Sequence, residues 1–232
     1  MRLTILELAA RWADAGGVLD EVDARLAAGP PSDLVVLPEA ALHGYVSPDG
    51  DFDLARFAEP LDGPTGMRCA AIARARGVHL VAPLVLRESP ALYNAIALFD
   101  PAGAPVFVYR KRHPWFPEEW ATPGREPPPV VEIAGRRVTC AICFDVHFLA
   151  SDAAAQLHAA DVLVFPSAWV EEVDSRPQLL STLARQFDLH VANANWAPGV
   201  VRIPGQGGSC VFGPRGELIA RATEAGRIDV LL

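Results

Sequence analysis

Short apolar, β-branched runs alternate with helical patterns along most of the chain, and this alternation limits the possible folds more than any other feature. Eight runs have the period-two or continuous apolar pattern of strands: residues 2–8, 33–37, 78–86, 95–99, 106–110, 137–144, 161–165 and 190–195. Helical spacing covers four segments between them: a face of Val18, Leu19, Val22 and Leu26, and residues 66–76, 149–160 and 176–189. Strands that alternate with helices predict an α/β fold.

Two turn motifs predict antiparallel neighbours within this pattern. Residues 100–103 (Asp-Pro-Ala-Gly) and 213–216 (Gly-Pro-Arg-Gly) are typical of hairpin turns, so we expect mixed rather than purely parallel sheets. Residues 114–129 are rich in proline but also carry Trp115, Phe116 and Trp120, which favours an ordered loop beside a pocket. With no repeat or evident linker, we expect a single domain over residues 1–232.

Composition excludes several classes of function. Hydrophobic residues make up 51% of the 232 residues, yet no apolar run approaches the roughly 20 residues that cross a bilayer, and residues 1–10 lack the pattern of a signal peptide. A formal net charge of −8 disfavours nucleic acid as a partner. Four scattered cysteines are typical of reduced thiols, so we expect a cytoplasmic protein.

Cys140 and Cys143 form a Cys-x-x-Cys pair, but their spacing argues against a redox or zinc site. Residues three apart in a strand point to opposite faces, with Cα atoms about 10 Å apart, which exceeds the roughly 7 Å limit for a disulfide. No second pair or histidine cluster stands at zinc spacing. We therefore expect neither a metal nor a cofactor.

Three chemically useful side chains stand where predicted strands end, which is where α/β folds place their sites. Glu39 follows the run 33–37, Lys111 follows the run 106–110, and Cys143 lies near the end of the run 137–144. A thiol nucleophile, a carboxylate base and a cation for a developing oxyanion form a sufficient set for acyl transfer. Taken alone, Cys143 is more typical of a buried structural cysteine.

Lys111 is the single lysine in a chain with 19 arginines. Lysine offers a compact ammonium whose pKa can fall on burial, whereas arginine is a planar and permanently charged fork. Either the composition is biased toward arginine by chance, or this position requires an amine.

Three segments of the chain closely resemble the signature segments of the nitrilase superfamily, the carbon–nitrogen hydrolases. They are Leu37-Pro38-Glu39 with Gly44-Tyr45, Tyr109-Arg110-Lys111-Arg112-His113, and Ala141-Ile142-Cys143-Phe144-Asp145. Further matches are Tyr93-Asn94-Ala95, Pro166-Ser167-Ala168-Trp169 and Gly207-Gly208-Ser209. The resemblance covers nearly the whole chain.

The resemblance implies an α-β-β-α sandwich with mixed sheets, which forms four layers and pairs further into a homodimer or higher homo-oligomer. It implies a cofactor-free centre of Glu39, Lys111 and Cys143, supported by a glutamate on the loop after the lysine. Glu118 is the favoured candidate for that glutamate, and Glu119 is the alternative. Phe144, Trp169 and Glu119 are the expected substrate contacts.

Asp145 resembles the amidase and carbamylase branches, because nitrile-cleaving members usually carry Trp-Glu after the cysteine. Phe144 and His147 depart from the Tyr and Arg common in amidases. We therefore expect a thiol hydrolase that cleaves a non-peptide carbon–nitrogen bond of a small amide or carbamoyl amide with water. The alternatives are a non-catalytic binding or regulatory member of the same fold, and a Cys-His hydrolase in which His147 is the base.

Overall fold

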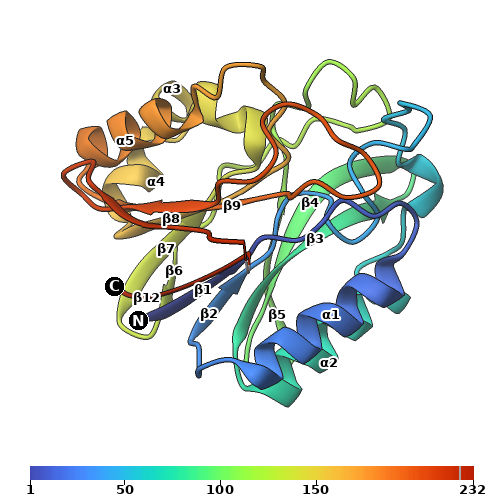
Figure 1. The fold of residues 1–232 in the computed structure, drawn as a ribbon, viewed down its shortest axis with the longest axis horizontal. Helices are drawn as coiled ribbons and strands as arrows, with labels where there is room; N and C mark the ends of the chain where they lie inside the picture. The colour runs from blue at the N-terminus through green and yellow to red at the C-terminus, as the bar shows by residue number, and fades with distance from the viewer. Residues whose placement is uncertain (225) are drawn as a thin grey trace.

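Two six-stranded sheets pack face to face, and helices cover the outer face of each (Figure 1). The structure is a computed structural model that describes residues 1–224 and 226–232. The first sheet has the order β12 (Arg227–Leu231), β1 (Arg2–Leu6), β2 (Leu34–Val36), β3 (His79–Glu88), β4 (Ala91–Phe99) and β5 (Pro105–Arg110). The second has the order β11 (Leu218–Arg221), β10 (Cys210–Phe212), β9 (His190–Asn195), β8 (Val162–Ser167), β7 (Arg136–Cys140) and β6 (Val131–Ile133). The expected α-β-β-α sandwich is confirmed.

Both sheets have parallel strands in the middle and antiparallel strands at the sides. β1, β2 and β3 are parallel to one another, as are β7, β8 and β9, and every other neighbouring pair is antiparallel. The two turn motifs join β4 to β5 and β10 to β11, where the N–H of Gly103 donates to Asp100 and that of Gly216 to Gly213. The prediction of mixed sheets is therefore confirmed.

The apolar run of β2 is continuous because both faces of the sheet are covered. Leu34 and Val36 belong to the core between the two sheets, whereas Val35 and Leu37 pack in the core beneath the helices of the first sheet. Helix α1 (Ala15–Ala28) buries the predicted face of Val18, Leu19, Val22 and Leu26 in that second core. Two apolar layers therefore hold the first sheet in place.

Helix α2 (Pro64–Arg76) lies beside α1 over the first sheet, and α3 (Leu149–Asp152), α4 (Ala154–Ala159) and α5 (Arg176–Phe187) cover the second (Figure 1). Pro64 begins α2 at a position where a missing N–H costs nothing, and Gly77 ends it in the left-handed conformation. A short 3₁₀ helix, η1 (Ala55–Phe57), lies in the connection between β2 and α2.

Three predicted elements are wrong in extent. The strand expected over 95–99 begins four residues earlier, at Ala91. The strand expected over 137–144 ends at Cys140, and residues Cys143–His147 form a 3₁₀ helix, η2, because Asp145 accepts hydrogen bonds that turn the chain away from the sheet. The helix expected over 149–160 is broken at Ala153, whose φ of −137° is not helical. The break directly follows Asp152, whose carboxylate is held by His113.

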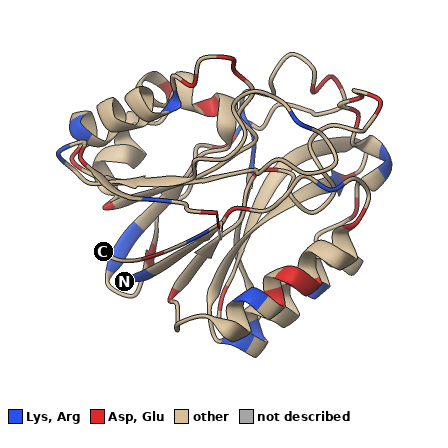
Figure 2. Ribbon diagram, viewed as in Figure 1, with Lys and Arg blue, Asp and Glu red and all other residues tan. Residues whose placement is uncertain are grey.

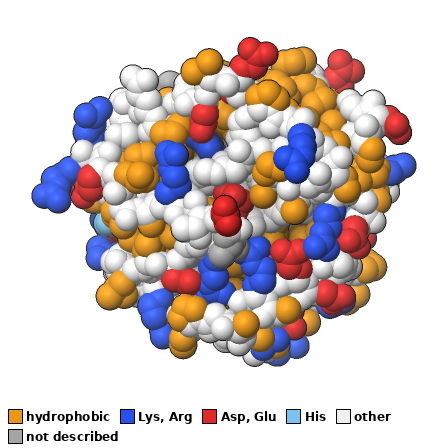
Figure 3. All heavy atoms as spheres, in the orientation of Figure 1, with side chains coloured by type: hydrophobic (Ala, Val, Ile, Leu, Met, Phe, Trp, Pro, Cys, Tyr) orange, Lys and Arg blue, Asp and Glu red, His pale blue; other side chains and the backbone are white. Residues whose placement is uncertain are grey.

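Four strands were not predicted: β6, β10, β11 and β12. Three of them have only three or four residues, and β12 is stabilised by pairing with β1 from the opposite end of the chain. Charges of both signs lie on helices and loops (Figure 2) and are scattered over the face drawn in Figure 3. Within the described residues, no helix has the length and apolarity to cross a bilayer.

Candidate active site

Strand direction brings the predicted site residues to one edge of the sandwich. β5 runs in the same direction as β2 and β3, because β4 is antiparallel to both β3 and β5. Glu39, shortly after β2, and Lys111, directly after β5, therefore lie at the same edge of the first sheet. Cys143 and Ala168 follow β7 and β8 of the second sheet. The site is thus assembled from both sheets.

Lys111 lies between two carboxylates in the interior. Its Nζ donates to Oε1 of Glu39 at 2.7 Å and to Oε1 of Glu118 at 2.9 Å, and all three side chains are almost completely buried. Asn94 on β4 donates its Nδ2 to the same two oxygens, at 2.8 Å and 3.0 Å. The backbone N–H of Ala168 donates to Oε2 of Glu39 at 2.9 Å and fixes the other side of that carboxylate.

The carboxylates keep the lysine charged. Burial opposes the charge of Lys111, but Glu39 and Glu118 outweigh burial, so its pKa lies above the usual value. Burial raises the pKa of Glu118, an effect that Lys111 partly offsets and Glu39 increases. A buried lysine can lose its proton, but Lys111 is an ammonium ion held between the carboxylates of Glu39 and Glu118.

Cys143 is the first residue of η2 and has a φ of +41°, an uncommon conformation for a residue other than glycine. Such strain often accompanies a functional site. Burial raises the pKa of its thiol well above the usual value, Glu39 raises it further, and Lys111 lowers it. The resting side chain is therefore a protonated thiol, which needs a base to become a nucleophile. Glu39 and Lys111 both act on the pKa of this thiol.

Asp145 connects the turn that carries Cys143 to the end of β5, where Lys111 lies. Its Oδ1 accepts the backbone N–H groups of Arg112 at 3.1 Å and His113 at 2.9 Å, directly beyond Lys111. Its Oδ2 accepts the Tyr109 hydroxyl at 2.9 Å and the N–H of Ile142 at 3.2 Å. One buried carboxylate thus connects the two sheets beside the site.

We expect Asp145→Asn to lower the free energy of unfolding by about 1–3 kcal/mol, because the new amide nitrogen cannot accept and leaves buried donors unpaired. Urea denaturation followed by circular dichroism measures the change. Asp49→Asn is the matched control, since Asp49 is exposed in a loop. Equal stability of wild type and Asp145→Asn would contradict the structural role assigned to this carboxylate.

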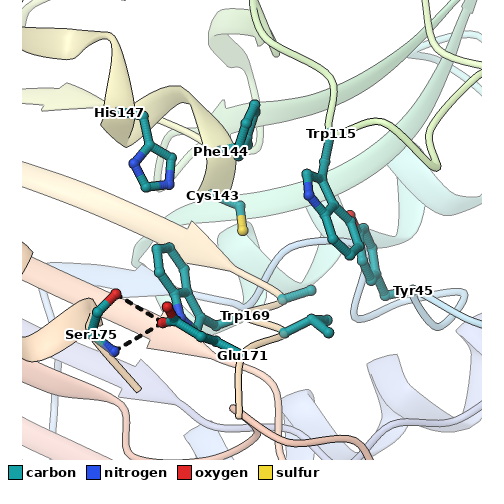
Figure 4. Close-up of a pocket in the computed structure, with 10 residues that line it drawn as sticks. Tyr45, Trp115, Cys143, Phe144, His147, Trp169, Glu171 and Ser175 are labelled. Carbon is teal, nitrogen blue, oxygen red and sulfur yellow. Dashed lines mark hydrogen bonds between the residues drawn. The ribbon is translucent and has the colours of Figure 1, made fainter. Parts of the chain in front are cut away.

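A pocket of about 150 Å³ opens over Cys143. Figure 4 shows the sulfur between Phe144 and His147 on one side and Trp169 and Glu171 on the other, with Trp115 and Tyr45 closing the end. Drug-sized ligands need pockets of about 300 Å³ or more, whereas an apolar space of roughly 150 Å³ can hold a molecule the size of benzene. The pocket therefore suits a small substrate.

The structure distinguishes between the two candidate glutamates. Glu118 contacts Lys111 and also accepts the N–H of Trp115 at 2.9 Å, whereas Glu119 is exposed and lines a separate hollow. Phe144 and Trp169 line the pocket, so two of the three expected substrate contacts lie beside Cys143. Their roles stay predictions, and the substrate contact predicted for Glu119 has no support in this geometry.

Sequence reasoning assigned no role to Asn94 or to the pocket residues Tyr45 and Glu171. Asn94 lies in Tyr93-Asn94-Ala95, one of the segments that resemble the family, and this resemblance was the signal in the sequence that could have identified it. His147 lines the pocket, with its ring centroid 5.1 Å from that of Phe144 and 5.9 Å from that of Trp169. Burial lowers its pKa, so the imidazole is neutral at neutral pH.

Comparison with known proteins places the chain in a family. The carbon–nitrogen hydrolase family matches residues 2–230. A Pseudomonas protegens hydrolase encoded in the pqqF 5' region is 30% identical over 227 residues, 96% of this chain and 79% of the relative. An (R)-stereoselective amidase of a Pseudomonas species is 34% identical over 168 residues, 71% of this chain and 59% of the relative.

The fold also matches solved structures. A glutamate-to-glutamine mutant of the amidase from Nesterenkonia sp. AN1, with acrylamide added at its active-site cysteine, aligns at a TM-score of 0.83. It is 28% identical, and the alignment covers 100% of this chain and 93% of that one. The chain belongs to the carbon–nitrogen hydrolase family. It is therefore an enzyme of the carbon–nitrogen hydrolase class, and its relatives and structural neighbours include amidases.

Proposed function

We propose that this enzyme hydrolyses a small non-peptide amide or carbamoyl amide through Cys143. The observation that carries the proposal is the position of a strained, buried thiol at the base of a small pocket, under the influence of Glu39 and Lys111. The amidase relatives support the reaction class, and the pocket volume supports a small substrate.

In the proposed reaction, the sulfur of Cys143 attacks the carbonyl carbon while Glu39 accepts the thiol proton. The displaced electron pair moves to the carbonyl oxygen, which faces the Lys111 ammonium and the backbone N–H of Phe144. The carbon–nitrogen bond then breaks, and the leaving ammonia or amine takes the proton from Glu39. Water hydrolyses the resulting thioester by the same steps, giving the acid and the free thiol.

His147 is a weaker candidate for the base. Its ring packs against Phe144 and Trp169. Within the described residues neither His147 nor Glu39 makes a hydrogen bond with Cys143, but Glu39 acts on the charge of that thiol. Glu39, in contrast, is fixed by three donors at the edge where the thiol lies. This difference supports the Cys-Glu-Lys arrangement over the Cys-His alternative.

Ammonia release from a panel of small amides, carbamoyl amides and nitriles tests the proposal, with the Cys143→Ala protein as the blank. We expect amides or carbamoyl amides to release ammonia and nitriles to release none. Release from nitriles alone would contradict the proposed branch. A homodimer in the cytoplasm is also proposed from the family resemblance, and light scattering of the purified protein checks the dimer.

We expect Lys111→Arg to lower kcat by about 10² to 10³, the usual cost of removing one oxyanion donor. Arginine keeps the charge, but its longer planar fork does not fit between Glu39 and Glu118, whose oxygens lie 2.7 Å and 2.9 Å from Nζ. Steady-state kinetics measures the loss, with circular dichroism to confirm folding. If the folded variant turned over at the wild-type rate, positive charge alone would suffice at this position.

A further inference from the structure

Glu171 places a carboxylate in the wall of the pocket without taking part in the chemistry described above. It lies shortly after β8, below Cys143 in Figure 4 and next to Trp169 and Ser175. Three hydrogen bonds fix one oxygen: Oε2 accepts Nε1 of Trp169 at 2.9 Å, the N–H of Ser175 at 2.9 Å and the Ser175 hydroxyl at 2.8 Å. Within the described residues, Oε1 accepts no hydrogen bond.

Glu171 is the only charged side chain in the described lining of this pocket. Hydrogen bonds from Ser175 and Trp169 lower its pKa, so the group is a carboxylate at neutral pH. Across the pocket, burial lowers the pKa of His147 more than the Glu171 carboxylate raises it, so the imidazole is mainly neutral at that pH. Among the residues that the structure describes, no lysine or arginine lines the pocket, and the buried Lys111 is already paired with two carboxylates. The pocket wall at Glu171 is therefore negatively charged, and this wall would meet the end of a substrate that lies away from Cys143.

The surroundings of the pocket have the same sign. A second hollow lies beyond Trp115, whose ring packs on Phe116 with centroids 4.6 Å apart. Its described lining carries Asp51, Asp53 and Glu119 and no basic side chain. The carboxylates of this neighbouring hollow raise the concentration of cations around them and lower that of anions.

We propose that the pocket selects amides whose far end carries an ammonium or guanidinium group, and that Oε1 of Glu171 binds this cation. The proposal rests on the proposed function. The fixed Oε2 holds the carboxylate in place, so binding need not order it. Trp169 lines the pocket beside Glu171, and Trp115 and Tyr45 close the other end of the pocket with further aromatic surface.

Three amides of matched length provide the test: γ-aminobutyramide, which is cationic, pentanamide, which is neutral, and glutaramate, which is anionic. We expect kcat/KM for the cationic amide to exceed that for the neutral one by about tenfold, the size expected for one charge-assisted hydrogen bond. The anionic amide should be the poorest substrate. Added salt should reduce the cationic advantage.

Glu171→Gln should remove that advantage, because glutamine keeps an oxygen for the three local donors and turns the free oxygen into a donor. Glu172→Gln is the matched control, since Glu172 is exposed and does not line the pocket. It should leave the ratio between cationic and neutral amides unchanged. An equal ratio in wild type and Glu171→Gln would overturn the proposal.

Calorimetric binding of the three amides to Cys143→Ala separates this proposal from the proposed function. If Cys143→Ala binds the cationic amide best and the Cys143→Ala, Glu171→Gln double variant loses this preference, the subsite is supported. That conclusion would hold even if the wild type hydrolysed none of the three amides, a result that would overturn the proposed function. Hydrolysis of all three amides at equal kcat/KM would leave the function standing and overturn the subsite.

Discussion

Replacing Cys143 with alanine is expected to reduce amide hydrolysis to background, a loss of about 10⁶ in kcat by analogy with the removal of a serine nucleophile. The thiol forms the bond that replaces the carbon–nitrogen bond, and no other side chain in the described pocket lining is a comparable nucleophile near Glu39 and Lys111. Single-turnover and steady-state ammonia assays measure the loss.

Cys140→Ala is the matched control for this change. Cys140 is also buried in the core and ends β7, but it does not line the pocket. We expect near-normal turnover in that variant, with a modest loss of stability. An acyl adduct trapped during turnover should map by mass spectrometry to Cys143, and mapping to Cys69, Cys140 or Cys210 would show that the nucleophile is assigned incorrectly.

Glu39→Gln is expected to lower kcat by about 10² to 10⁴, the usual contribution of general acid–base catalysis. An amide of the same size cannot take a proton from Cys143. It also cannot satisfy its surroundings, because Oε1 accepts from Lys111 and Asn94 while Oε2 accepts from Ala168. One of these donors will face the new NH₂ group.

Glu126→Gln is the control for the loss of charge, since Glu126 is exposed within the proline-rich loop, residues 114–129. Steady-state kinetics over a range of pH distinguishes the two roles that Glu39 could have. Glu39→Gln removes the contribution of Glu39 to the raised pKa of the Cys143 thiol, but the larger contribution from burial remains, so we expect alkaline conditions to leave the variant impaired. Recovery to the wild-type rate at high pH would mean that the carboxylate only promotes thiolate formation.

Local patterns predicted the elements whose apolar periodicity is complete. Val18, Leu19, Val22 and Leu26 identify a helix because they share one face, and the run 33–37 identifies a buried strand because both faces are covered. Glu39, Lys111 and Cys143 could be found because each stands near the end of such a run. These features depend on neighbours in sequence, so the sequence alone reveals them.

Other features depend on partners far away in the chain. Asn94 contacts carboxylates 55 and 24 residues away, and only the folded sheets bring these groups together. The strand expected to continue to Phe144 ends early because Asp145, with partners on another sheet, turns the chain. β12 has only a short period-two pattern, and it forms a strand because it pairs with β1. Sequence reasoning had no local signal for these long-range choices.

The division of the site between two sheets makes reactivity conditional on complete folding. Glu39 and Lys111 come from the first sheet, Cys143 comes from the second, and Asp145 joins them through Tyr109, Arg112 and His113. A chain with only one sheet formed would carry a thiol without its base, or a base without its thiol. While the protein is being synthesised or degraded in the cell, such an incompletely folded molecule would be unreactive. Indiscriminate acylation of its thiol would be avoided until the two sheets have packed together.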